Sequence, residues 1–96
     1  MHWTDKESAI VKDILKNHIP HEEVHAFGSR VHGKNLKKTS DLDLVIMTKT
    51  PLSDAIMMNL KHAFSESDLP FRVDILDWSQ TEPYFQEIIL KAHQNI

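Results

Sequence analysis

The chain has 96 residues, of which 41% are hydrophobic, and this suits one small domain with a core of its own. Its net charge of −3 excludes a protein that is basic overall and binds nucleic acid by charge. Cysteine is absent, which excludes disulfides and cysteine zinc sites, and no signal-peptide pattern or apolar run of about 18 residues is present. We therefore expect a single cytoplasmic domain over residues 1–96, with no membrane contact and no direct nucleic-acid binding.

Helical signals open the chain. Thr4 and Glu7 have the spacing of a capping box, and apolar residues then recur at helical intervals. The sequence therefore predicts a first helix over about residues 4–18. A strand is expected after it, over about residues 22–27.

Further strands and helices are expected to alternate along the rest of the chain. A second strand is predicted over about residues 41–47, a helix beginning near Ser53, and a third strand over residues 71–76. A last helix is predicted after a cap at Ser79 or Thr81. With a short helix after the first strand, the order αβ(α)βαβα predicts an α+β (α/β) fold, a small mixed sheet with helices packed on it.

Two short motifs stand where the first strand ends and the second begins. Gly28 and Ser29 at a strand end can expose backbone N–H groups to a phosphate. Asp41 and Asp43 point the same way, because side chains alternate along a strand. Mg²⁺ prefers one or two carboxylates together with the phosphates of a substrate. The combination therefore indicates a site for a metal and a phosphate.

A third carboxylate, Asp74, lies on the third predicted strand. Alternation places it on one face with Arg72, so one interpretation is an Arg72–Asp74 ion pair on an open face of the sheet. The other interpretation gives Asp74 a function, because a charge in the middle of a strand needs a partner or a role. Asp77 falls on the opposite face at the strand end, and we expect it to be a turn residue.

At these residues the chain resembles the nucleotidyltransferase superfamily, whose members are DNA polymerase beta-like. It is most similar to the minimal nucleotidyltransferases (MNT antitoxins) that pair with HEPN-domain toxins, over roughly residue 24 to the last helix. The resemblance implies the minimal nucleotidyltransferase fold, with Asp41, Asp43 and Asp74 as catalytic residues and metal ligands. Eleven residues separate Ser29 from Asp41, one more than is usual in the family.

The resemblance also implies a reaction and a partner. AMP would move from ATP, with Mg²⁺, to a hydroxyl of a HEPN RNase toxin, most simply a tyrosine, and the protein would act as the antitoxin in a hetero-oligomer. Gly28 and Ser29 would bind the phosphates of ATP. Arg30 and Lys34 are candidates for steadying the pyrophosphate.

Two other functions remain open at this point. One is a non-catalytic antitoxin that neutralises the toxin by stoichiometric binding, against which the complete set of acids argues. The other is a nucleotidyltransferase that acts on a small molecule. A zinc site at His18, His21 and His25 is disfavoured, because a helix end, a turn and a strand do not bring three imidazoles together. These histidines are expected at the surface.

Overall fold

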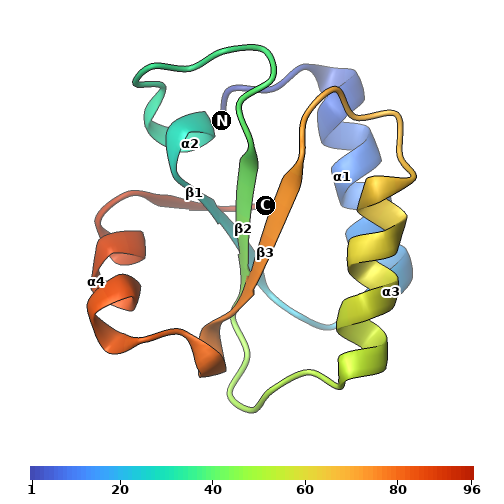
Figure 1. The fold of residues 1–96 in the computed structure, drawn as a ribbon, viewed down its shortest axis with the longest axis vertical. Helices are drawn as coiled ribbons and strands as arrows, with labels where there is room; N and C mark the ends of the chain where they lie inside the picture. The colour runs from blue at the N-terminus through green and yellow to red at the C-terminus, as the bar shows by residue number, and fades with distance from the viewer.

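A computed structural model describes all 96 residues as a four-stranded mixed sheet with helices on both faces (Figure 1). The helices are α1 (Asp5–His18), α2 (Ser29–His32), α3 (Asp54–Ser65) and α4 (Pro83–Lys91), with a 3-10 turn at Trp78–Gln80. The strands are β1 (Val24–Phe27), β2 (Leu42–Ile46), β3 (Val73–Asp77) and β4 (His93–Asn95). The predicted fold class is confirmed. None of the helices has the length and apolar character needed to cross a membrane.

The strands lie in the order β3-β2-β1-β4. Strand β1 runs antiparallel to both β2 and β4, whereas β2 and β3 are parallel and are joined through α3. One row of directly opposed residues crosses the whole sheet; we call it the cross-sheet row, and it consists of Asp74, Asp43, Phe27 and His93. Since opposed residues on neighbouring strands point to the same face, this row brings acids from two strands together.

Helices α1 and α3 cover one face of the sheet and enclose the larger part of the core. Thr4 caps α1 as predicted: the Glu7 N–H donates to Thr4 Oγ1 at 3.1 Å, and the Thr4 N–H donates to Glu7 Oε1 at 2.9 Å. Ser53 caps α3 as predicted. Alternate residues of β2 supply the centre of this core and are fully buried; they are Leu42, Leu44 and Ile46.

Helix α4 covers part of the opposite face, on the other side of the sheet from α1 and α3 in Figure 1. Ile89 packs against Phe27 and Val45, and the Phe85 ring meets the Phe27 ring edge-on with centroids 5.9 Å apart. Asp43 and Val45 share this face, because they are two residues apart on β2. The apolar contact with α4 therefore begins at Phe27, in the same row as the acids, and continues along β2 at Val45.

The last helix begins later than predicted, at Pro83 with Glu82 as the N-cap, so neither Ser79 nor Thr81 caps it. Both hydroxyls instead bind Asp77: Ser79 Oγ donates to Asp77 Oδ1 at 2.6 Å, and Thr81 Oγ1 donates to the Asp77 carbonyl at 2.8 Å. These bonds hold the 3-10 turn that follows β3. Asp77 is thus the turn residue that the sequence indicates.

Strand β4 was not predicted, and it changes the surroundings of His25. His25 is buried, so its expected surface position is wrong. Its Nδ1 lies 2.8 Å from Nδ1 of His93 on β4, and its Nε2 lies 2.7 Å from a Glu23 carboxylate oxygen. The imidazole of His25 therefore joins the edge strand β4 to β1.

Candidate active site

The three predicted carboxylates meet where β2 and β3 run side by side. Asp43 on β2 is directly opposite Asp74 on β3, and Asp41 lies just before β2. Neutral apolar residues fill the other face of both strands, since Leu42, Leu44 and Ile75 belong to the core under α1 and α3. The parallel register therefore turns the acids together toward the opposite face.

The backbone of Gly28 lies directly against Asp43. Gly28 has φ +80°, in the left-handed region that glycine adopts without strain, and a Cβ placed on it would be 2.4 Å from Asp43 Oδ2. No side chain fits there. The glycine therefore lets the first turn of α2, which begins at Ser29, approach the acids of β2.

The three acids lie close enough for their negative charges to repel one another. Burial, together with the charges of Asp74 and Asp41, raises the pKa of Asp43 to about 6. An ionised carboxylate in this position is disfavoured until positive charge is supplied. Carboxylate oxygens are the donors that Mg²⁺ takes, so the donor set and the excess negative charge both suit this ion.

The acids do not form a closed cage. No group of three or more His, Cys, Asp or Glu side chains is arranged to hold a metal ion by itself. Asp74 instead lies 3.7 Å from the Arg72 guanidinium. An ion bound here would take its remaining ligands from water and from a substrate, as Mg²⁺ commonly does.

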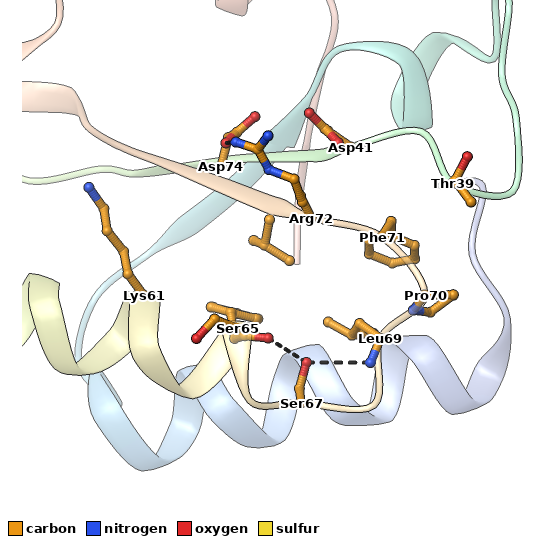
Figure 2. A pocket seen from close by; sticks show the side chains of 12 residues that line it. Thr39, Asp41, Lys61, Ser65, Ser67, Leu69, Pro70, Phe71, Arg72 and Asp74 are labelled. Carbon is orange, nitrogen blue, oxygen red and sulfur yellow. Dashed lines mark hydrogen bonds and ion pairs between the residues drawn. The ribbon is translucent and has the colours of Figure 1, made fainter.

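A hollow of about 600 Å³ opens beside the acids, between the start of β3 and the C-terminal half of α3 (Figure 2). Asp41 and Asp74 lie at one side of it, and Ser65 and Ser67 lie at the other. A second hollow of about 570 Å³ is lined by Asp43 and Asp74 together with apolar side chains, among them Phe27 and Phe85. The acids are therefore accessible from two neighbouring hollows, which share Asp74 in their lining.

Residues 10–96 match the family model described as polymerase beta, nucleotidyltransferase. The chain belongs to this nucleotidyltransferase family. A curated relative from Haemophilus influenzae, the probable protein adenylyltransferase MntA, is 56% identical over 88 residues, which cover 92% of this chain and 76% of the relative.

Solved structures agree with this nucleotidyltransferase in fold. A crystal structure of a toxin–antitoxin with AMP-PNP matches with a TM-score of 0.73 at 19% identity, over 91% of this chain and 69% of that one. A mutant of the toxin–antitoxin MntA-HpeT also has a TM-score of 0.73 at 19% identity, over 98% of this chain and 72% of that one. At such identities the agreement concerns the fold alone.

Arg30 lies where a nucleotide contact is not expected. The nucleotidyltransferase buries this guanidinium, which donates to the carbonyls of Ser40 at 2.9 Å, His2 at 2.8 Å and Lys38 at 2.7 Å. It also stacks on the Phe71 ring, 3.8 Å from the centroid. All three guanidinium nitrogens are therefore used within the protein. This is a correction to the predicted pyrophosphate contact, and Arg30 has a structural role.

The other predicted residues of the nucleotidyltransferase site remain accessible. Ser29 is half-buried at the start of α2, beside Gly28. Lys34 is exposed, and its backbone N–H donates to His32 Nδ1 at 3.0 Å, whereas its ammonium group forms no ion pair. Ser29 and Lys34 therefore stay candidates for contacts with a nucleotide.

One cation near the acids was missed. Lys61 on α3 is exposed, and it lines both hollows that contain Asp74. Figure 2 shows it extending from α3 on the side of Asp74. In the sequence, Lys61 is unusual because it is a lysine within the apolar stripe of a helix, between Leu60 and Phe64. Its proximity to Asp74 cannot be predicted without knowing that β3 packs next to α3.

Proposed function

We propose that this protein is a Mg²⁺-dependent adenylyltransferase that moves AMP from ATP to a tyrosine hydroxyl of a HEPN RNase toxin, and that it is the antitoxin of that toxin. One observation carries the chemistry: Asp43 lies between the Gly28 backbone and Asp74, with Asp41 adjacent. The name of the Haemophilus influenzae relative, at 56% identity, supports the protein acceptor.

Each part of the site has a role in this proposal. The backbone at Gly28 and the hydroxyl of Ser29 bind phosphate oxygens of ATP, because no side chain at residue 28 blocks the approach. Asp41, Asp43 and Asp74 are the residues that would hold Mg²⁺. When bound, this ion would neutralise the triphosphate and activate the α-phosphorus for attack.

The reaction is an in-line displacement. The acceptor oxygen forms a bond to the α-phosphorus, the bond from that phosphorus to the bridging oxygen of the β-phosphate breaks, and pyrophosphate leaves with the electron pair. The hydroxyl proton passes to a carboxylate, and Asp74 is the candidate, since it lies on the edge strand and lines both hollows. The acceptor hydroxyl can therefore enter from a second protein.

The experiment uses Asp74→Asn. Labelled ATP, Mg²⁺ and a candidate HEPN RNase toxin are mixed with the natural protein or with the variant, and AMP on the RNase is measured by mass spectrometry. We expect the variant to bind the RNase, to add no AMP, and to fail to protect cells that express the RNase. Protection by Asp74→Asn with no AMP on the RNase would instead establish an antitoxin that acts by binding alone.

A second measurement concerns the ligands. ATP and Mg²⁺ together should raise the melting temperature well above the effect of either one alone, because the acids provide an incomplete set of ligands. Asp43→Asn should remove the joint effect. An equal shift with ATP alone in the presence of EDTA would contradict a metal-dependent site.

A further inference from the structure

Arg72 is the one arginine or lysine paired with an acid of the candidate site. Its guanidinium lies 3.7 Å from an Asp74 carboxylate oxygen. In the view of Figure 2 it projects toward the carboxylate of Asp74. A positive group therefore lies beside this acid.

The sheet register explains this position. Leu42 is opposed to Val73, so the residues that precede them, Asp41 and Arg72, are brought next to each other. The Leu42 N–H donates to the Arg72 carbonyl at 2.9 Å, which extends the ladder by one step. Since Arg72 and Asp74 are two residues apart, their side chains share a face.

The two arginines near this site differ in their freedom to move. Arg30 is buried and holds three carbonyls. The Arg72 side chain is 81% exposed, and Asp74 is its single charged partner at a long distance. An exposed pair of this kind contributes little stability and separates easily. Arg72 can therefore leave Asp74 without disturbing the fold.

We propose that Arg72 is the internal counter-cation of the nucleotide-free site: it pairs with Asp74 where a divalent cation would bind, and it is displaced when that cation arrives. Arg72 is thus a positioning residue that acts through Asp74. This inference rests on the proposed function, in that it requires the acids to bind a divalent cation.

The proposal has a direct consequence for metal affinity. A cation that binds Asp74 must compete with the guanidinium, so removal of the guanidinium strengthens binding. Because an exposed ion pair is weak, we expect Arg72→Gln to bind Mn²⁺ about two- to five-fold more tightly than the natural protein. Arg72→Lys keeps a positive charge there and should stay nearer to the natural affinity.

The test measures Mn²⁺ binding to the nucleotide-free protein by water-proton relaxation, which detects weak sites and needs no enzymatic turnover. Mn²⁺ is the probe because it takes carboxylate ligands as Mg²⁺ does. Lys16→Gln is the matched control, since it removes one exposed positive charge from α1, on the face of the sheet opposite the acids. Circular dichroism establishes that each variant is folded.

A double-mutant cycle separates competition at Asp74 from a general effect of charge. In an Asp74→Asn background, Arg72→Gln should no longer change Mn²⁺ affinity, because the partner of the guanidinium is gone. An unchanged affinity in Arg72→Gln, or a gain that persists in the Asp74→Asn background or also occurs in Lys16→Gln, would overturn the proposal.

The same titration distinguishes a failure of this inference from a failure of the proposed function. Mn²⁺ binding that is lost in Asp43→Asn but unaffected by Arg72→Gln would refute the role of Arg72 alone. Absence of Mn²⁺ binding in the natural protein and in Arg72→Gln would refute both the counter-cation and the metal site.

Discussion

The carboxylate of Asp43 occupies the space in which a side chain at residue 28 would lie, with a Cβ on Gly28 only 2.4 Å from Asp43 Oδ2. The backbone at Gly28, just after β1, therefore packs directly against the carboxylate of Asp43 on β2. Any nucleotide held by the backbone at residue 28 is held next to that carboxylate. A substitution that disturbs this contact is the most direct test of the site.

Gly28→Ala should abolish AMP transfer while the protein still folds. The new methyl group meets Asp43, and φ +80° is a strained conformation for alanine, so we expect a loss of about 1–2 kcal/mol in the free energy of unfolding. Gly33→Ala is the matched control. Gly33 also has positive φ, +74°, but its Cβ would meet the end of the His2 side chain.

Urea unfolding and a labelled-ATP assay compare these two glycine variants. Both should lose stability, and only Gly28→Ala should lose transfer at temperatures where it is folded. Equal transfer by the two variants would show that the contact between residue 28 and Asp43 has no part in the reaction.

Asp43→Asn should abolish transfer and stabilise the metal-free protein at neutral pH. The pKa of Asp43 is raised to about 6, above the value near 4 of an unfolded chain, so the natural protein loses stability as pH rises from about 4 to about 6. The asparagine variant does not lose this stability, because its side chain carries no charge at any of these pH values. Since solvent screens a half-exposed group, we expect a gain of about 1–2 kcal/mol at pH 7.

Urea unfolding in EDTA at several pH values measures this difference between Asp43→Asn and the natural protein. The gap should shrink as pH falls toward 4 and close below it, where Asp43 is protonated in both the folded and the unfolded state. A gap that widens on acidification, or transfer activity that survives the substitution, would argue against the role and the environment assigned to Asp43.

Asp77→Asn should have the opposite dependence on pH. Burial alone would raise the pKa of Asp77, but hydrogen bonds from Ser79, Thr48 and the Leu52 N–H outweigh it and lower the pKa. Stability from this carboxylate is therefore present above the pKa of the unfolded chain and is lost as pH falls through the lower pKa of the folded one. We expect a cost of about 1–3 kcal/mol at pH 7.

Thermal melting of Asp77→Asn beside Asp68→Asn, an exposed control, gives the measurement. The cost should diminish as pH falls below about 4. Loss of transfer by folded Asp77→Asn would mean that Asp77, and not the turn alone, contributes to the chemistry.

Arg30→Lys should destabilise the protein by about 2–3 kcal/mol, because an ammonium group cannot reach three separate carbonyls as the guanidinium does. Lys34→Gln is the comparison, since Lys34 is exposed and should affect nucleotide binding without affecting stability. Melting curves and ATP titrations of both variants provide the check. If Arg30→Lys keeps its full stability but cannot bind ATP, then Arg30 faces the nucleotide as the sequence suggests.

Local signals predicted most of the fold. The capping box of Thr4 and Glu7 and the cap at Ser53 depend on residues three positions apart, so they can be read without knowledge of the tertiary structure. Alternation along β2 likewise placed Asp43 on the face opposite Leu42 and Leu44, and the structure agrees.

The features that escaped prediction depend on contacts between distant segments. Strand β4 has three exposed polar residues and no alternation, so only its pairing with β1 defines it. Ser79 could cap a helix in sequence, but the carboxylate of Asp77 takes its hydroxyl. The sequence suggests that Arg30 contacts phosphate, because the loop carbonyls that bind its guanidinium can be identified only from the structure.

The hydrogen bonds from Arg30 to the loop carbonyls affect where residues can be inserted between α2 and β2. The guanidinium fixes the carbonyls of Lys38 and Ser40, immediately before Asp41. Residues inserted earlier in that loop, around Asn35, would bulge into solvent at small entropic cost, whereas one residue added within β2 would turn Asp43 into the core. We therefore expect this loop to accommodate one residue more or one residue fewer without moving the first acid.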